Sequence, residues 1–109
     1  MKLSSAIKLA IVSLSLSGIA STSAIASEDG KKLYSEKLCM TCHGDEGKKP
    51  ILSSYPKLNG QNKDYLVAQI KMIKDGTRAG GGTAAMKAMT ATLTDDEIEA
   101  ISTYLSEVE

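Results

Sequence analysis

The chain has 109 residues and contains no tryptophan and no phenylalanine, so its four tyrosines are its only aromatic side chains. Aromatic side chains normally supply much of the buried apolar area of a small domain. Their scarcity favours a core built around a large hydrophobic group that the polypeptide does not itself provide.

The sequence also lacks an apolar run long enough to cross a bilayer. Its most apolar stretch, Leu9–Ala20, is about a dozen residues long and is interrupted by serines, whereas a spanning helix needs roughly 20 apolar residues. Two lysines make a basic start, and Ala24-Ile25-Ala26 follows as a small-x-small cleavage site, which is the pattern of an export signal. We therefore expect residues 1–26 to be a cleaved signal peptide. A retained N-terminal membrane anchor is the alternative.

Cleavage would leave residues 27–109 as one exported domain of 83 residues, soluble in the periplasm. The full chain has no net charge, and the domain would carry −2, because two of the 13 basic residues and none of the 13 acidic ones lie in the signal. A near-neutral domain excludes bulk nucleic-acid binding as its main activity. A domain of this size is only marginally stable on its apolar core alone, so we expect another group to stabilise it.

Period-two alternation over the length of a strand is missing, so we expect an all-α domain. Apolar spacing predicts three helices: residues 28–38, residues 62–76, and a last helix that starts at the capping box Thr94-Asp95-Asp96-Glu97. The intervening loops, 44–61 and 77–83, are rich in glycine and proline. Loops of this length in a small domain are usually functional or disordered.

Both cysteines and the only histidine fall within five residues, Cys39-Met40-Thr41-Cys42-His43. A disulfide or a Cys-x-x-Cys redox pair gives no role to the histidine, and tetrahedral zinc needs four ligands where this cluster offers three. Covalent haem uses all three residues: the thiols of Cys39 and Cys42 bond to the two vinyl groups as thioethers, and the His43 imidazole becomes the proximal ligand of the iron. The motif therefore predicts one covalently bound haem c.

Three longer segments, one of which contains this motif, carry a resemblance to a known family: "GKKLYSEKLCMTCHGDEG", "YPKLNGQNKDYLVAQIKMIKDGTR" and "MKAMTATLTDDEIEAISTYL". These segments resemble class I cytochrome c, in particular the short bacterial periplasmic type that occurs as a single-haem protein or as one half of tandem dihaem chains. The resemblance implies a cytochrome c fold, with three or more helices around one haem and the terminal helices crossing at Gly30 and Tyr104. Tyr34 lies five residues before Cys39, where many relatives have four.

Electron transfer needs a closed second axial position, and a thioether sulfur suits it because it favours ferrous iron. Met40 lies between the two cysteines and Met72 lies within a predicted helix, which leaves Met86 and Met89. In the family, the ligand methionine stands seven residues before the leucine that introduces the last helix, which here is Leu93. The resemblance thus implies Met86 as the distal iron ligand. Met89 is the runner-up.

The resemblance also implies that the carbonyl of Pro56 accepts a hydrogen bond from the outer nitrogen of His43 and so fixes the ring.

With both axial positions filled, and with no acid–base pair or substrate pocket visible in the sequence, the site predicts a carrier and not an enzyme. We expect a monomeric electron-transport protein that docks transiently, at its haem edge, on periplasmic or membrane-bound redox proteins. Two other interpretations stay open. The chain can be a cytochrome subunit of a periplasmic dehydrogenase complex, or a copper-binding protein, because thiols and thioethers are soft ligands suited to Cu(I).

Overall fold

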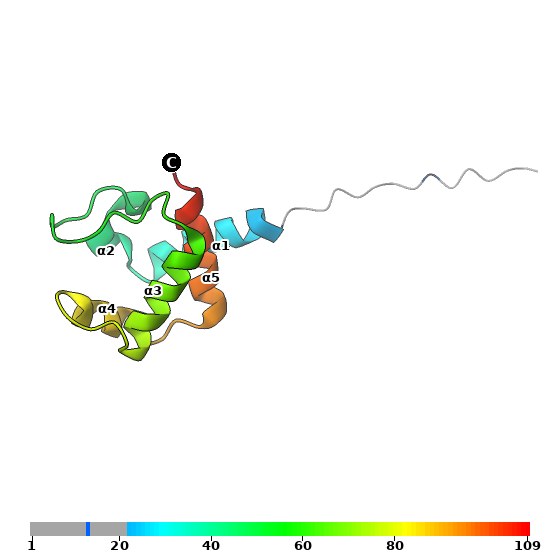
Figure 1. Ribbon diagram of the computed structural model, residues 1–109. Helices are drawn as coiled ribbons and strands as arrows, with labels where there is room; N and C mark the ends of the chain where they lie inside the picture. The colour runs from blue at the N-terminus through cyan, green and yellow to red at the C-terminus, as the bar shows by residue number, and fades with distance from the viewer. Residues whose placement is uncertain (1–12, 14–21) are drawn as a thin grey trace, which may run out of the picture.

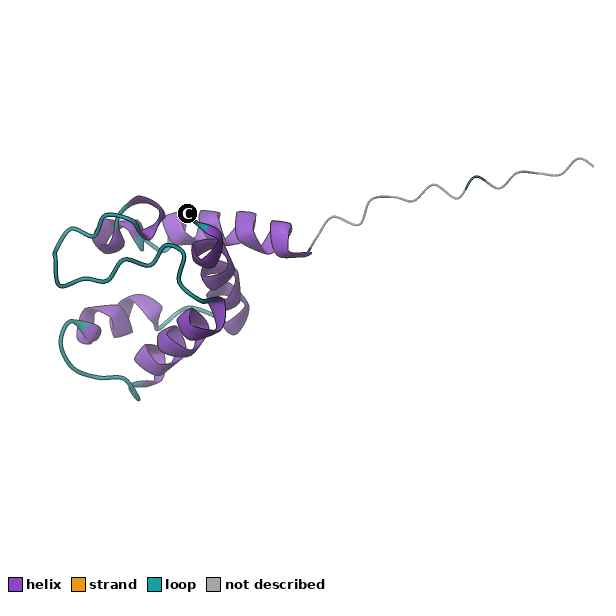
Figure 2. Cartoon of the chain, turned by 45° about the horizontal axis from the view of Figure 1, so that its top comes forward, coloured by secondary structure: helices purple, strands orange, loops and turns teal. Residues whose placement is uncertain are grey.

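The computed structural model describes residue 13 and residues 22–109 (Figure 1). The described residues are helical, with no strand among them (Figure 2), and the all-α prediction is confirmed. The elements are, in chain order, α1 (Thr22–Glu36), α2 (Met40–His43), the 3-10 turn η1 (Asp45–Gly47), α3 (Lys63–Asp75), α4 (Thr83–Thr90) and α5 (Asp95–Glu107).

Two helices begin and end close to where their sequence signals predict. The side chain of Asn62 accepts a hydrogen bond from the N–H of Tyr65 at the start of α3, and Gly76, in the left-handed conformation with φ 86°, ends that helix. At the start of α5, the N–H of Thr94 donates to Glu97 Oε1 (3.0 Å) and the N–H of Glu97 donates to Thr94 Oγ1 (3.2 Å). The expected capping box is therefore present.

The core lies at the junction of α1, α3 and α5. It is a single cluster of buried apolar side chains: Tyr34, Leu66, Leu93, Ile98, Ile101, Tyr104 and Leu105. None of these residues comes from α2 or α4, and the buried residue of α4 is Thr90. Figures 1 and 2 show α2 with its following loop, and α4 with its preceding loop, as two lobes at the end of the molecule away from the start of α1. The buried apolar cluster therefore lies at the helix junction, and neither α2 nor α4 contributes a residue to it.

The terminal helices α1 and α5 pack directly on each other at Gly30. A Cβ atom at Gly30 would overlap the carbonyl oxygen of Ala100 and would lie 2.7 Å from Tyr104 Cβ. One turn further along, the rings of Tyr34 and Tyr104 lie with their centroids 5.8 Å apart, tilted by 58°, a favourable geometry for an aromatic pair. The crossing at Gly30 and Tyr104 that the resemblance implies is present.

The first helix differs from its predicted range of 28–38 at both ends. It begins at Thr22, because the residues around the expected cleavage site continue the helix in the uncleaved chain, and it ends at Glu36. Leu38 then adopts a left-handed φ of 61° and is 57% exposed. The N–H of Cys39 donates to the Tyr34 carbonyl, five residues back, at 3.1 Å. Leu38 thus turns outward, while Tyr34 reaches the core and Cys39 packs against it.

The predicted signal peptide lies mostly outside the described residues, and its last residues, 22–26, form the start of α1. Among the helices that the structure describes, none combines the length and apolar character that crossing a membrane requires.

Candidate haem-attachment site

The Cys-x-x-Cys-His motif folds as the single helical turn α2, with Cys39 at its N-cap. A separation of three residues places the thiols of Cys39 and Cys42 on one face of this turn. Both cysteines are half-buried and free, and His43 is 6% exposed. The turn closes through the N–H groups of His43 and Gly44, which donate to the carbonyls of Cys39 (3.1 Å) and Met40 (2.9 Å).

The orientation of the His43 ring is fixed by the loop that follows α2. His43 Nδ1 lies 3.0 Å from the carbonyl oxygen of Pro56. A carbonyl only accepts, so Nδ1 carries a proton and donates, and Nε2 takes no part in this contact. The structure therefore contains the contact expected between His43 and Pro56. It leaves Nε2 as the ring nitrogen available to a metal, on a ring whose orientation the loop fixes.

A second hydrogen bond ties α1 to the end of the motif. The hydroxyl of Tyr34 donates to the carbonyl oxygen of Gly44 at 2.6 Å. Burial of Tyr34 raises its pKa well above the ordinary value, so the phenol stays protonated and able to donate. Gly44 has φ 78°, and a Cβ there would overlap the carbonyl of Lys49. Sequence reasoning missed this anchor because the two residues belong to different elements and carry no pairing signal.

The Cys39 thiol lies in an environment that keeps it protonated. Burial, the largest cause, raises its pKa to about 11. A protonated thiol is a weak nucleophile, because the thiolate is the reactive form.

The two candidate methionines lie on α4, in the lobe opposite α2 (Figure 1). Thr83 and Met86 are half-buried and Thr90 is buried. Their spacing of i, i+3 and i+7 places them on one stripe of the helix. Met89 lies off that stripe and is 43% exposed. The inward stripe of α4 therefore contains Met86.

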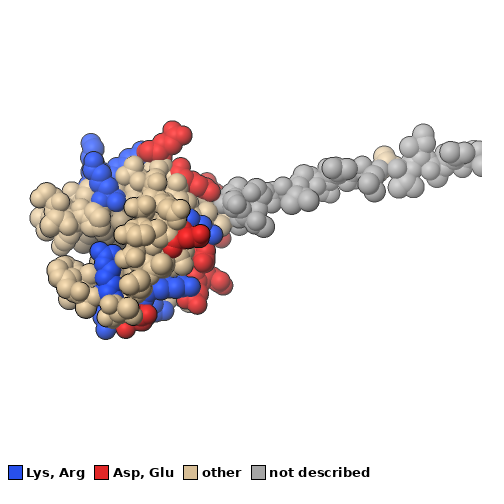
Figure 3. Space-filling view, viewed as in Figure 1, with Lys and Arg blue, Asp and Glu red and all other residues tan. Residues whose placement is uncertain are grey.

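Large apolar side chains are exposed on both lobes, with Ile51 and Leu52 on the loop after α2 and Met89 on α4. Figure 3 shows the surface hollowed between the two lobes, whose tips carry neither acidic nor basic side chains. Exposed apolar groups on both sides of a hollow indicate a site for a large hydrophobic ligand. Together with two thiols and one oriented imidazole on α2, this arrangement fits haem.

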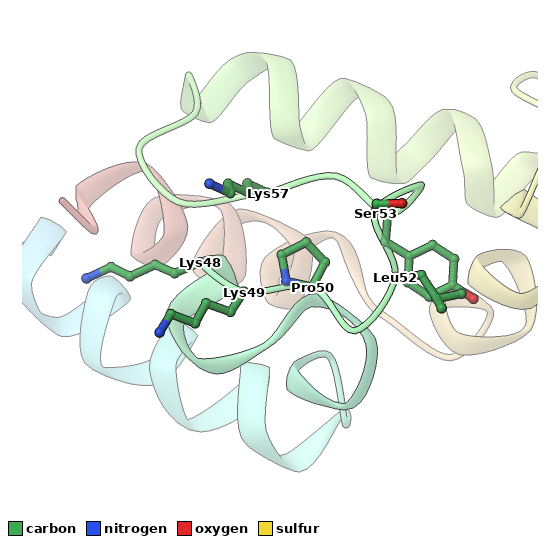
Figure 4. A pocket seen from close by; sticks show the side chains of 7 residues that line it. Lys48, Lys49, Pro50, Leu52, Ser53 and Lys57 are labelled. Carbon is green, nitrogen blue, oxygen red and sulfur yellow. The ribbon is translucent and has the colours of Figure 1, made fainter.

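Another hollow is lined by the loop after α2 (Figure 4). Its volume is about 570 Å³, and its lining consists of Lys48, Lys49, Pro50, Leu52, Ser53, Tyr55 and Lys57. The three lysine side chains extend to one side of it, and Leu52 lies at the other. The Tyr55 ring centroid is 6.3 Å from that of His43. Tyr55, which lines this hollow, thus lies next to the His43 imidazole.

An all-α fold, crossed terminal helices and a Cys-x-x-Cys-His turn with an oriented histidine define a c-type cytochrome. Residues 27–109 match the family described as cytochrome c, and the chain belongs to that family. It is a c-type cytochrome that carries electrons through covalently bound haem c, as its sequence predicts.

Similar proteins support this assignment. The chain is 41% identical over 71 residues to cytochrome c-554(548) of Halomonas halodenitrificans, a match that covers 65% of this chain and 84% of that protein. It is 34% identical over 70 residues to the thiosulfate dehydrogenase electron acceptor of Stutzerimonas stutzeri, covering 64% of this chain and 32% of that one. The crystal structure of reduced recombinant cytochrome c4 from Pseudomonas stutzeri has a TM-score of 0.71 and 31% identity, and the match covers 79% of this chain and 50% of that chain. The present chain thus matches half of a longer cytochrome chain.

Proposed function

We propose that residues 27–109 form a periplasmic, monomeric carrier that passes one electron at a time and is not itself an enzyme. A single haem is attached to Cys39 and Cys42, with His43 and Met86 as its axial ligands. The haem supplies the iron that alternates between the ferric and ferrous states. The observation that carries the proposal is the hydrogen bond from His43 Nδ1 to Pro56 O, because it orients a buried imidazole and leaves Nε2 as the nitrogen available to iron.

Met86 completes the proposed site from the opposite lobe. Its position on the inward stripe of α4 supports it over Met89, and so does its spacing to Leu93. A soft sulfur ligand favours ferrous iron and raises the reduction potential. A filled sixth position also keeps small molecules off the iron, which supports a carrier over a catalyst.

Export to the periplasm is proposed from the signal pattern in residues 1–26. The match to the cytochrome c family begins at Ser27, the first residue of the expected mature chain. Cleavage there would leave Gly30 and the α1–α5 crossing intact, because that contact lies after the cleavage site.

The ligand assignment is tested by comparing Met86→Leu with Met89→Leu in the haem-loaded protein. Met86→Leu should lose the weak sulfur-to-iron absorption in the near red, lower the reduction potential, and let carbon monoxide bind the ferrous form. Met89→Leu is nearly volume-conserving, so it should keep the spectrum and cost at most about 1.5 kcal/mol in stability. The opposite pattern would assign the ligand to Met89.

A subunit of a periplasmic dehydrogenase is the second candidate function, because one relative is named as the electron acceptor of thiosulfate dehydrogenase. Purification of the native protein at low ionic strength distinguishes the two. A free carrier elutes alone at the size of the domain. A subunit elutes with a larger partner in constant ratio, and that partner accounts for substrate oxidation.

A further inference from the structure

The helix that carries both candidate methionines has little support of its own. α4 has eight residues, its N-cap residue Gly82 makes no side-chain hydrogen bond, and its first turn contains no acidic residue. Helices shorter than about 12 residues are marginal in water unless tertiary contacts hold them. α4 packs chiefly on α3, and it buries only Thr90. Its position therefore depends on what ties it to α3.

Lys74, in the last turn of α3, supplies one such tie. Its half-buried ammonium group donates to the carbonyl oxygen of Leu93 at 2.5 Å. Leu93 is buried in the segment that joins α4 to α5, and its own N–H donates to the carbonyl of Thr90, the last residue of α4, at 3.0 Å. A hydrogen bond from a charged donor is roughly twice as strong as one between neutral groups. A single side chain thus holds the C-terminal end of α4 to α3.

A lysine from α4 approaches α3 in the opposite direction. Lys87 Nζ lies 3.0 Å from where a Cβ atom at Gly76 would stand, and Gly76 is the residue that ends α3. A cation is favourable at the C-terminal end of a helix, where carbonyl groups lack partners. This second contact is more exposed than the first, because Lys87 is exposed and Lys74 is half-buried. We therefore expect Lys74 to contribute more.

We propose that Lys74 is a positioning residue for the distal iron ligand: its hydrogen bond to Leu93 holds α4 in the place from which a methionine sulfur reaches the iron. This inference rests on the proposed function, in which Met86 is that ligand. Met86 lies seven residues before Leu93, so a movement of the Leu93 segment away from α3 would carry the sulfur with it. Local openings of this kind occur without global unfolding.

The test uses Lys74→Leu and, as a matched control, Lys71→Leu in the ferric, haem-loaded protein. Lys71 lies one turn earlier on α3, and its 3.8 Å ion pair with Asp95 is solvent-exposed, so the control loses the same charge without freeing a carbonyl. The measurement is the rate at which added imidazole abolishes the near-red sulfur band. Loss of a hydrogen bond from a charged donor should accelerate this replacement about tenfold in Lys74→Leu. Lys71→Leu should stay within about twofold of the wild type.

Lys74→Arg should restore a rate near that of the wild type, because a guanidinium group can still donate to the Leu93 carbonyl. If Lys74→Leu yields too little protein, Lys74→Gln, whose neutral amide is too short to reach, takes its place with the same expected acceleration. Equal imidazole rates for the Lys74 and Lys71 variants would overturn the proposal. So would an arginine variant as fast as the leucine variant.

The spectra of the two methionine variants separate this inference from the ligand assignment. If Met89→Leu and not Met86→Leu loses the sulfur band, the assignment of Met86 is wrong, but the comparison of the Lys74 and Lys71 variants still decides the positioning role, because both methionines lie on α4. If both methionine variants keep the band, the ligand is not on α4 and both proposals fail.

Discussion

Substitution of Gly30 by alanine tests how closely α1 and α5 approach at their crossing. The added Cβ would overlap the Ala100 carbonyl oxygen and lie 2.7 Å from Tyr104 Cβ, where ordinary contact is 3.4–4 Å. Neither a helix backbone nor a Cβ atom can rotate aside, so the two helices must separate by about 1 Å. That separation also loosens the ring contact between Tyr34 and Tyr104, which spans 5.8 Å between centroids.

The expected change in the free energy of unfolding combines three contributions. Forcing an extra methyl group into a close-packed contact costs about 1–3 kcal/mol, and weakening an aromatic pair costs about 0.5–1.5 kcal/mol. Alanine is preferred over glycine inside a helix by about 0.5–1 kcal/mol, which offsets part of this loss. We expect Gly30→Ala to lower the free energy of unfolding of the haem-loaded protein by about 2–3 kcal/mol.

The assay is guanidinium unfolding followed by far-ultraviolet circular dichroism and by haem absorbance. Gly82→Ala is the control, because Gly82 has φ −81° and the nearest atom to an added Cβ is Tyr55 Cε1 at 3.6 Å. The control should change stability by less than about 1 kcal/mol, the usual range for such a cap position. A Gly30→Ala protein as stable as its control would refute the close crossing.

Two further predictions concern hydrogen bonds of the fold. Tyr34→Phe should lower the free energy of unfolding by about 1 kcal/mol, because it removes the hydroxyl donor to the Gly44 carbonyl and leaves only the N–H of Gly47 as its partner. An unchanged denaturation midpoint would show that the Tyr34 contact does not anchor the motif. The pKa of Glu97 is held below its ordinary 4.5, mainly by the backbone N–H of Thr94 and further by Lys37. The ionised carboxylate therefore stabilises the fold at pH values above 4.5. This contribution is lost as the pH falls through the depressed pKa. The difference in unfolding free energy between wild type and Glu97→Gln should therefore be full at pH 7 and shrink steadily below about pH 4.5, and a difference that is constant from pH 7 to pH 3 would contradict this.

The parts of the fold that could be predicted from sequence are those specified by local signals. Asn62 and Gly76 bound α3, and Thr94 and Glu97 start α5, through contacts within a few residues. α2 escaped prediction because one helical turn is too short to show an apolar period. α4 escaped because it follows a glycine-rich loop and has neither a capping side chain nor a buried apolar stripe.

The candidate site likewise has one part that local sequence signals predict and another part that they do not. The cysteines and His43 are adjacent in the chain, so their chemistry could be recognised from the sequence alone. The anchor from Tyr34 to Gly44 and the tie from Lys74 to Leu93 join segments 10 and 19 residues apart. No local pattern predicts such contacts, because they depend on how the helices pack.

The left-handed residue between α1 and α2, Leu38, decides how the first helix aligns with that of a chain one residue shorter at this place. Tyr34 and Cys39 keep their places on either side of Leu38 only because that one residue turns outward into solvent. In an alignment with a chain whose aromatic residue lies four residues before the first cysteine, and not five as here, the one-residue gap therefore belongs at Leu38. Placing it anywhere upstream would shift the first helix by about 100° relative to α5 and misassign every residue of the crossing.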